Sequence, residues 1–371
     1  MASIKKLLYL VSEDHYFVSH RFALAKAAIA SGYEVHLATT VSKYEKQIVD
    51  AGIHLHKLES FQRASTHPLN QFHCLRELWQ LYKKVNPDIV HQVAIKPVLY
   101  GSLIAIVLGV PMIVNALAGL GFVFISKSFK AKALRIIVIP LMRFVFTRPN
   151  QILIVQNQDD YALWLNKYKI KNIVLIRGSG VDIHTFKPAV IANKIPIILF
   201  PARMLWDKGT WELIEAARIL KSRNVKFDLW FCGDIDHKNP SRISNEKLEN
   251  WQSEGLIKWM GYQSDMVGIY QKADIVVLPS YREGLPKSLL EAAACGIPMV
   301  ASDVPGCREI VIHEKTGLLV PVKESAPLAD ALLRLINDQD LCVQMGKAAR
   351  QLVQSEFSDD IVISATLKTY Q

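Results

Sequence analysis

The sequence predicts an α/β protein that contains two doubly wound parallel sheets. Short apolar runs alternate with helical stretches along the first half of the chain, and the second half repeats this pattern. Most of the runs are continuously apolar, which is typical of parallel strands covered by helices on both faces of a sheet. The 371 residues are enough for two domains of ordinary size.

The expected strands fall into two groups. Those of the first half are Lys6–Val11, Glu34–Thr39, Asp88–Val93, Met112–Ala116 and Gln151–Val155. Those of the second half are Pro196–Pro201, Phe227–Cys232, Ile257–Met260, Asp274–Leu278 and Pro298–Ala301. Helical stretches such as His20–Ser31 and Leu69–Lys84 separate them. Ligands of such sheets bind at the carboxyl ends of the strands, so two domains of this kind that face each other are expected to form a central cleft.

The basic residues are concentrated in the first half. Up to Asp182 the chain has 22 Lys and Arg against 11 Asp and Glu, and after it 22 against 23. A half this basic is expected to bind an anionic partner, either nucleic acid or an anionic membrane surface. The stretch 186–196 lies between the charge halves and contains two prolines. We therefore place the first domain at residues 1–187 and the second from residue 188.

The cysteines and histidines give no sign of a metal site. The cysteines are odd in number, scattered and without a C-x-x-C pair, which argues against a disulfide framework and fits a reducing compartment. His54 and His56 alternate on a strand-like run with no third ligand nearby, as expected for an exposed strand face. The apolar run near Leu7 is too short for a signal peptide and is expected to be a buried first strand.

Two apolar segments raise the question of a membrane. The stretch 97–126 has no charged residue, but its glycines and prolines predict a helix, a turn, a buried strand and a glycine loop rather than a membrane span. The stretch 129–146 combines apolar runs with Lys130, Lys132, Arg135 and Arg143. Such a segment is expected to lie in a membrane interface. The alternative is a helix that packs on the sheet with a solvated basic edge.

Arg203 and Lys208 lie in the segment Pro201–Gly209, between a predicted strand and the helix that follows it. Both cations are therefore expected at the carboxyl edge of the second sheet. The N-terminus of a helix adds partial positive charge and free N–H groups there. Alone, two cations five residues apart are usually part of a solvated surface. In this position they predict a diphosphate site.

Glu283 and Glu291 flank the start of another helix, after the predicted strand that ends near Leu278. Glu283 is expected on the loop and Glu291 about a turn and a half into the helix, which begins near Pro286. Glutamates near a helix start often only complement its dipole. In one sheet, the Arg and Lys residues lie between one strand and its helix, and the Glu-Gly and Glu residues follow another strand at the start of its helix. This order predicts a site for a nucleotide sugar.

These motifs resemble family 4 glycosyltransferases, which have the GT-B fold and retain the anomeric configuration. The resemblance covers essentially the whole chain. It implies that Arg203 and Lys208 hold the donor diphosphate, that Glu291 binds ribose, and that Glu283, Gly284, Leu285 and Pro286 contact the donor. It also implies a second domain of residues 188–355 and a C-terminal helix, residues 356–371, that returns to the first domain. Of these residues, Arg203, Lys208 and Glu283 are expected to act in catalysis.

The segments Lys96–Gly101, Ala202–Gly209 and Leu278–Ala294 are similar to a narrower group. Those enzymes move an N-acetylhexosamine or hexose from a UDP-sugar to a sugar linked to undecaprenyl diphosphate, at the inner face of the bacterial membrane. The resemblance implies the same lipid-linked acceptor in polysaccharide assembly, a peripheral cytoplasmic location, and neither a metal nor another cofactor. Departing UDP would be stabilised by Arg203 and Lys208, and a diphosphate oxygen would take the proton of the acceptor hydroxyl.

The chain departs from the family at two places. Residues 12–17 replace a glycine-rich loop, and no histidine lies near Ala118. We therefore name no catalytic histidine. The candidates for contact with the acceptor or a phosphate are His20, Arg21, Lys96, Gly119 and Gly121. The alternative for Arg21 is a surface charge at a helix start, and a buried structural role is an equal alternative for His91.

Other functions remain open at this stage. A GT-B nucleotide-sugar epimerase would keep the diphosphate site but need acid and base groups around the sugar. A transferase with a soluble acceptor would lack the membrane surface. A nucleic-acid-binding protein is disfavoured, because the basic half has no aromatic platform and the second half is nearly neutral.

Overall fold

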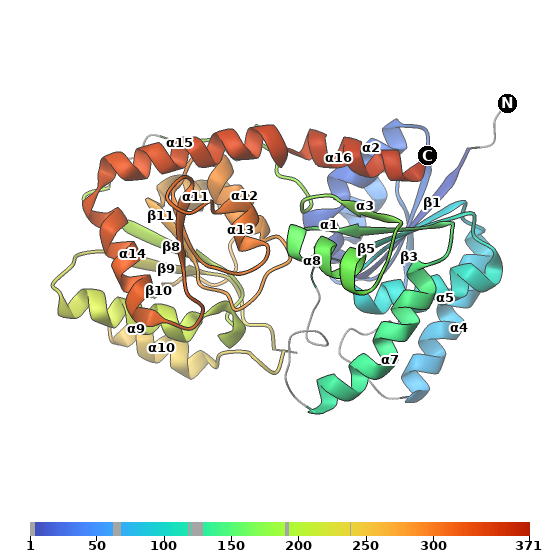
Figure 1. Cartoon of the computed structure of the whole chain (residues 1–371), viewed down its shortest axis with the longest axis horizontal. Helices are drawn as coiled ribbons and strands as arrows, with labels where there is room; N and C mark the ends of the chain where they lie inside the picture. Colours follow the sequence, from blue (N-terminus) through green and yellow to red (C-terminus); the bar gives the residue numbers. More distant parts are fainter. Residues whose placement is uncertain (1–3, 62–67, 118, 120–128, 190–192, 238) are drawn as a thin grey trace. The chain divides into compact units, whose positions relative to one another are not determined.

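A computed structural model describes residues 4–61, 68–117, 119, 129–189, 193–237 and 239–371 (Figure 1). The chain divides into two compact units. The first contains Met1–Ser179 together with Asp360–Gln371, and the second is Gly180–Asp359. The sequence predicts these boundaries after residues 187 and 355.

The first unit contains, in the described residues, a seven-stranded parallel sheet in the order β3-β2-β1-β4-β5-β6-β7. Its strands are β1 Lys6–Glu13, β2 Glu34–Thr40, β3 His54–Lys57, β4 Ile89–Val93, β5 Met112–Leu117, β6 Gln151–Val155 and β7 Ile173–Leu175. The helices are α1 Asp14–His20, α2 Phe22–Ala30, α3 Glu45–Asp50, α4 Pro68–Val85, α5 Ile95–Leu108, α7 Phe129–Phe146, α8 Gln158–Ala162 and the π-helical turn Leu163–Lys167. The strand order reverses between β1 and β4.

The second unit repeats this architecture with a six-stranded parallel sheet in the order β10-β9-β8-β11-β12-β13 among its described residues. Its strands are β8 Ile197–Pro201, β9 Asp228–Cys232, β10 Lys258–Trp259, β11 Ile275–Leu278, β12 Met299–Ser302 and β13 Gly317–Val320. The helices are the 3₁₀ turn η2 Trp206–Lys208, α9 Thr210–Ser222, α10 Asn245–Ser253, α11 Met266–Lys272, α12 Lys287–Ala294, α13 Cys307–Ile310, α14 Ser325–Asn337 and α15 Gln339–Glu356.

The central strands are buried because both faces of each sheet are covered. Every residue of β4, β8 and β11 is buried, as the continuously apolar runs predict. The predicted strands are confirmed within one or two residues at each end. All five cysteines are buried free thiols.

The last residues of the chain pack on the sheet of the first unit. Helix α16 Asp359–Leu367 and the turn Lys368–Tyr370 follow α15, and Val362 and Tyr370 join the core cluster around β1. The Tyr370 hydroxyl lies 3.0 Å from the Tyr9 hydroxyl and 2.5 Å from Nδ1 of His91. His91 is thus a buried residue of this core, and burial lowers its pKa well below the usual value.

The predicted helix His20–Ser31 is interrupted at Arg21. The backbone of Arg21 has φ −132° and ψ −7°, so α1 ends at His20 and α2 begins at Phe22. The Arg21 side chain is only 5% exposed, and it donates from Nη1 to the His20 carbonyl oxygen at 3.0 Å. The alternative of a surface charge at a helix start is therefore wrong for Arg21.

Helix α7 has two apolar faces. Val138, Met142 and Val145 pack into a core cluster of the first unit, whereas Ile136 and Ile137 are 76% and 68% exposed. The side chains of Lys130 and Lys132 lie outside the described residues. None of the helices in the described part of the chain is both long enough and apolar enough to cross a bilayer.

Three histidines gather on the edge strand β3 and its neighbour β2. His36 Nδ1 lies 3.0 Å from His56 Nε2, its Nε2 lies 2.9 Å from Glu34 Oε1, and its ring stacks on His54 with 4.8 Å between centroids. Burial, helped by His36, Lys84 and His54, lowers the pKa of His56 to about 4. The pKa of His36 is lowered by burial, although Glu34 opposes this. The expected exposed strand face is thus correct for His54, while His56 is half-buried.

This cluster predicts a loss of stability in acid. An unfolded His56 titrates near the ordinary pKa of about 6.5, so the unfolded chain takes up the proton first and stability falls as the pH drops from about 6.5 to about 4. In His56→Gln the decline of Tm over this range should be shallower. His73→Gln, at an exposed position on α4, is the control. Equal pH slopes for His56→Gln and the wild type would contradict the prediction.

Candidate active site

The segment after β8 lies against the turn after β9. Gly233 makes this packing possible, because a Cβ atom at that position would lie 1.9 Å from the Ala202 carbonyl oxygen. The Met204 amide donates to the Asp234 carbonyl oxygen at 3.0 Å. These contacts hold Arg203 at the carboxyl edge of the second sheet, where the sequence predicts it.

Lys208 ends the 3₁₀ turn η2, which is fixed from two sides. The Tyr281 amide donates to the Asp207 carbonyl oxygen at 3.0 Å, and the Thr210 hydroxyl donates to the Leu205 carbonyl oxygen at 2.9 Å. Gly209 follows with φ +73° and approaches Pro279, at the end of β11, too closely for any side chain. Lys208 is therefore held beside the neighbouring strand β11.

Lys208 and Glu283 form an ion pair across the carboxyl ends of β8 and β11. The two side chains are 21% and 12% exposed, so the pair is largely shielded from water. An ion pair in this position is stronger than one on an open surface, where the median contribution is about 0–1 kcal/mol. The pair joins two residues that are 75 positions apart in the sequence.

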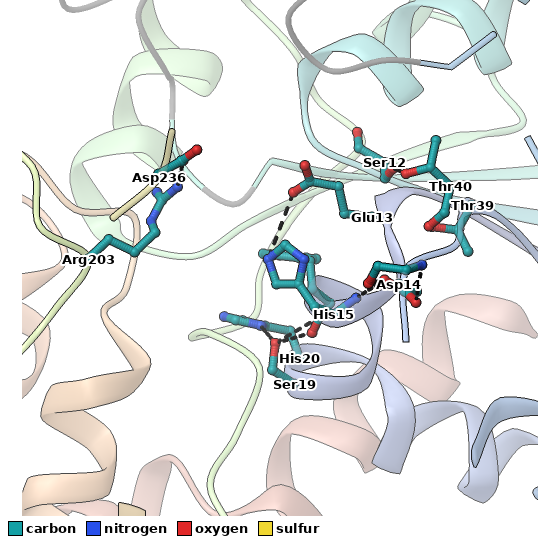
Figure 2. A network of polar contacts seen from close by, with 12 residues as sticks. Ser12, Glu13, Asp14, His15, Ser19, His20, Thr39, Thr40, Arg203 and Asp236 are labelled. Atoms are coloured by element: carbon teal, nitrogen blue, oxygen red, sulfur yellow. Dashed lines mark hydrogen bonds and ion pairs between the residues drawn. The ribbon is translucent and has the colours of Figure 1, made fainter. Parts of the chain in front are cut away.

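Arg203 also has a carboxylate partner. Its Nη1 lies 2.6 Å from Oδ2 of Asp236, in the segment after β9 (Figure 2). The Arg203 side chain is 44% exposed. Both predicted cations of the diphosphate site are thus paired with carboxylates, and an incoming diphosphate has to compete with Asp236 for the guanidinium.

The loop from Glu283 to Pro286 leads into α12. Pro286 is the N-cap residue, with φ −74° and ψ 115°, so the helix begins one residue later than Pro286. The first turn of α12 contains no acidic side chain that would occupy its N–H groups. Gly306 packs on this loop so closely that a Cβ atom there would lie 2.3 Å from the Gly284 carbonyl oxygen. Leu285 is buried and anchors the loop in the core of the unit.

Glu291 lies on α12, and its side chain is 15% exposed. Burial raises the pKa of its carboxyl group, while Lys287, with Nζ 4.0 Å from Oε1, and Tyr270 oppose the shift. The predicted donor residues Arg203, Lys208, Glu283 and Glu291 all belong to the second unit. Together they offer two cations and two carboxylates beside the start of a helix.

Comparison with known proteins identifies the family. Residues 183–352 match the model of the glycosyl transferases group 1, and residues 6–158 match that of the glycosyl transferase 4-like family. The N,N'-diacetylbacillosaminyl-diphospho-undecaprenol alpha-1,3-N-acetylgalactosaminyltransferase of Campylobacter jejuni is 30% identical over 363 residues, which cover 94% of each chain. The chain belongs to the group 1 glycosyltransferases.

Two further comparisons agree with this family. The UDP-Gal:alpha-D-GlcNAc-diphosphoundecaprenol alpha-1,3-galactosyltransferase of Escherichia coli is 27% identical over 76% of this chain and 75% of its own. The structure of Anabaena Alr3699/HepE in complex with UDP and glucose superposes with a TM-score of 0.77 over 99% of both chains, at 17% identity. The predicted family and the predicted GT-B fold class are confirmed. The prediction that the chain is a sugar-transferring enzyme is confirmed as well.

Three residues that support the predicted donor residues could not be recognised from the sequence. Asp236 was not expected to pair with Arg203. Gly306 was not recognised as the residue that lets two loops meet. The Tyr281 hydroxyl donates to the Glu212 carboxylate at 2.9 Å, and burial together with Glu212 raises the pKa of this hydroxyl. The only sequence signal for them is their position, since each follows a strand end or begins a helix of the second sheet.

The candidates in the first unit of the glycosyltransferase have different surroundings. His20 is half-buried at the end of α1, and Arg21 is buried. Lys96 lies in the first turn of α5 with Nζ 5.1 Å from the centre of the Phe61 ring, a cation–π arrangement. Gly119 has φ +119°, and Gly121 lies outside the described residues.

Proposed function

We propose that this glycosyltransferase moves an N-acetylhexosamine or hexose from a UDP-sugar to a sugar linked to undecaprenyl diphosphate, in the assembly of a bacterial surface polysaccharide or glycan. One observation carries the proposal. The shielded Lys208–Glu283 pair and Arg203 lie at the carboxyl edge of a sheet inside the group 1 region, in a chain that matches a transferase to a diphospho-undecaprenol sugar over 94% of both lengths.

On the donor side, Arg203 and Lys208 would bind the diphosphate and Glu291 the ribose hydroxyls. Glu283 and the backbone of residues 284–286 would contact the sugar. The preference for a uridine nucleotide is supported by the E. coli relative, whose name specifies UDP-Gal. The two carboxyl oxygens of Glu291, which lies beside Lys287, can accept hydrogen bonds from two ribose hydroxyls.

The proposed mechanism depends on charge stabilisation by the protein. As the bond between the anomeric carbon and the diphosphate oxygen breaks, negative charge develops on UDP. Lys208, Arg203 and the N-terminus of α12 stabilise this charge without a metal ion. The acceptor hydroxyl attacks from the side that UDP leaves, its proton passes to a diphosphate oxygen, and the anomeric configuration is retained.

The decisive experiment is a donor screen. The purified enzyme is incubated with UDP-sugars and with acceptors that carry a monosaccharide on a polyprenyl diphosphate, in the presence of EDTA. Transfer with an α-linked product from an α-linked donor supports the proposal. Transfer to free sugars alone would overturn the acceptor assignment, an inverted product would overturn retention, and activity that EDTA removes and Mg²⁺ restores would overturn metal independence.

The competition between Asp236 and the diphosphate gives a separate prediction. Asp236→Asn should bind UDP about two- to five-fold more tightly, because an exposed ion pair contributes about 0.2–1 kcal/mol and the variant no longer has to break one. Asp330→Asn is the matched control, since Asp330 forms a 2.6 Å ion pair with Arg223, the C-cap residue of α9. Calorimetric titration with UDP measures both. Unchanged or weaker UDP binding by Asp236→Asn would contradict the prediction.

We also propose that the enzyme docks on the inner face of the cell membrane through α7. The support is the exposed apolar face of this helix, formed by Leu134, Ile136, Ile137 and Phe144, beside exposed Arg143. Apolar side chains flanked by cations are typical of helices that lie in the interface of an anionic bilayer. The other face of α7 packs in the core, so the helix is held in a fixed orientation within the first unit.

The double variant Ile136→Asp/Ile137→Asp should reduce binding to vesicles with anionic lipid by at least about tenfold. In the wild type, both isoleucine side chains would move from water into the bilayer interface, and this transfer is favourable. Val343→Asp on α15, where the side chain is 61% exposed, is the control. Co-sedimentation at rising salt should also weaken wild-type binding. Binding by the double variant equal to that of the wild type would refute docking through α7.

A further inference from the structure

A second ligand-binding edge is expected in the first unit, where the strand order reverses between β1 and β4. Ligands of open parallel sheets bind outside the carboxyl ends of the strands at such a point. Helix α1 begins directly at the carboxyl end of β1. It carries Glu13 at its N-cap position and His20 at its last position.

Asp14 fixes the start of α1. Its buried carboxylate accepts hydrogen bonds from the Ser42 amide at 2.7 Å, the Ser42 hydroxyl at 2.6 Å and the Tyr44 amide at 3.1 Å. Burial tends to raise the pKa of Asp14, but these hydrogen bonds outweigh it and the pKa is lowered. Asp14 is therefore charged at neutral pH and ties α1 to the loop after β2.

The ring of His20 is held in one orientation. It stacks on Tyr16, with 4.2 Å between the ring centroids and 7° between the planes. The Ser19 hydroxyl lies 2.7 Å from His20 Nδ1 and 2.8 Å from the His15 carbonyl oxygen. A carbonyl oxygen only accepts, so the single hydroxyl proton is donated to it, and His20 Nδ1 must donate to the Ser19 oxygen. In the neutral imidazole the lone pair is then on Nε2.

We propose that His20 Nε2 accepts a hydrogen bond from a hydroxyl group of the acceptor sugar and orients it for transfer. This inference rests on the proposed function. A neutral imidazole with its proton on Nδ1 offers no donor at Nε2 to a phosphate, but it accepts from a hydroxyl group. Glu13, whose Oε2 lies 3.8 Å from His15 Nε2, adds a carboxylate at the other end of α1. Two acceptors on one short helix favour a ligand rich in hydroxyl groups over an anion.

The first test compares acceptor use with donor use. His20→Ala should lower kcat/KM for the acceptor about 10- to 100-fold, the effect of losing one positioned hydrogen bond. The KM for the donor, the affinity for UDP and the slow hydrolysis of the donor without acceptor should stay at wild-type values. His20→Gln should recover part of the activity, because its side-chain oxygen can accept near the position of Nε2. A larger donor KM in His20→Ala would overturn the assignment to the acceptor.

The second test is the pH profile for the acceptor. Protonation of Nε2 removes the lone pair, so kcat/KM for the acceptor should fall on the acid side as the imidazole takes up a proton. His20→Gln should lack this acid limb, whereas a residue with a purely structural role would not move it. His313→Gln is the matched control, because His313 is exposed and lies 3.7 Å from the carboxylate of Glu314. An acid limb that persists in His20→Gln would overturn the proposal.

The tests also separate this inference from the proposed function. Wild-type transfer to a polyprenyl-diphosphate sugar is established first, and the His20 variants are then assayed with that acceptor. If only a soluble sugar is glycosylated, the lipid acceptor is wrong, and the His20 variants are tested with the soluble sugar. Wild-type acceptor kinetics in His20→Ala, with either acceptor, would refute the role of His20.

Discussion

Lys208→Ala is expected to lower kcat for sugar transfer by about 10²–10³, the usual effect of removing one group that stabilises transition-state charge. Lys208 lies at the carboxyl edge of the second sheet, and its side chain is 21% exposed. Because Lys208 is largely shielded from water, its charge interacts more strongly with a nearby negative charge than it would in bulk water. Steady-state kinetics with saturating donor and acceptor measure the loss.

Removal of Lys208 also leaves Glu283 without its cation, which has to be separated from the catalytic effect. The variant Lys208→Met/Glu283→Gln removes both charges and should restore stability without restoring activity. Lys258→Ala is the surface control, because Lys258 is exposed and lies 5.2 Å from the centre of the Trp230 ring. Thermal unfolding and UDP titration accompany the kinetics. Turnover of Lys208→Ala within tenfold of the wild type would remove Lys208 from the proposed mechanism.

The proximity of the proposed donor residues could be predicted from the sequence because it depends on strand order. Continuously apolar strands predict a parallel sheet, and parallel strands bring all of their carboxyl ends to one edge. Arg203 and Lys208 follow β8, and Glu283 follows β11, which are neighbours in the sheet. Their proximity therefore follows from the pattern, although 75 residues separate Lys208 from Glu283.

The partners of these residues could not be predicted in the same way. Asp236 reaches Arg203 because two loops approach each other where Gly233 has no side chain, and loop approach has no periodic sequence signal. The burial of Arg21 was missed for a related reason. A continuous helix His20–Ser31 would present Arg21 at its start, whereas the break at this residue places the side chain inside the unit.

The contacts of His20 could not be predicted either, although they join residues that are close in the sequence. Tyr16, Ser19 and His20 are close in sequence, and their spacing of three and four residues would bring them together on any helix. The expected helix began only at His20, so this contact could not be recognised. Once α1 is known to span Asp14–His20, the stacking and the Ser19 hydrogen bond follow from helical geometry.

Gly209→Ala is expected to lower the free energy of unfolding by about 2–5 kcal/mol. Gly209 has φ +73°, and a Cβ atom there would lie 2.0 Å from the Pro279 carbonyl oxygen. The left-handed conformation alone costs an alanine about 1–2 kcal/mol. The contact adds about 1–3 kcal/mol of overpacking, because the obstacle is backbone at the end of β11 and cannot rotate away.

Gly261→Ala separates the two contributions to this cost. Gly261 belongs to the same unit and has φ +62°, but no atom lies within 4 Å of a Cβ atom at this position. Gly261→Ala should therefore lower the free energy of unfolding only by the cost of the left-handed backbone conformation, about 1–2 kcal/mol. Urea unfolding of both variants measures the difference, and equal costs would show that the approach to Pro279 is unimportant. Since Gly209 directly follows Lys208, the forced separation of η2 from β11 should also weaken UDP binding in Gly209→Ala and leave it unchanged in Gly261→Ala.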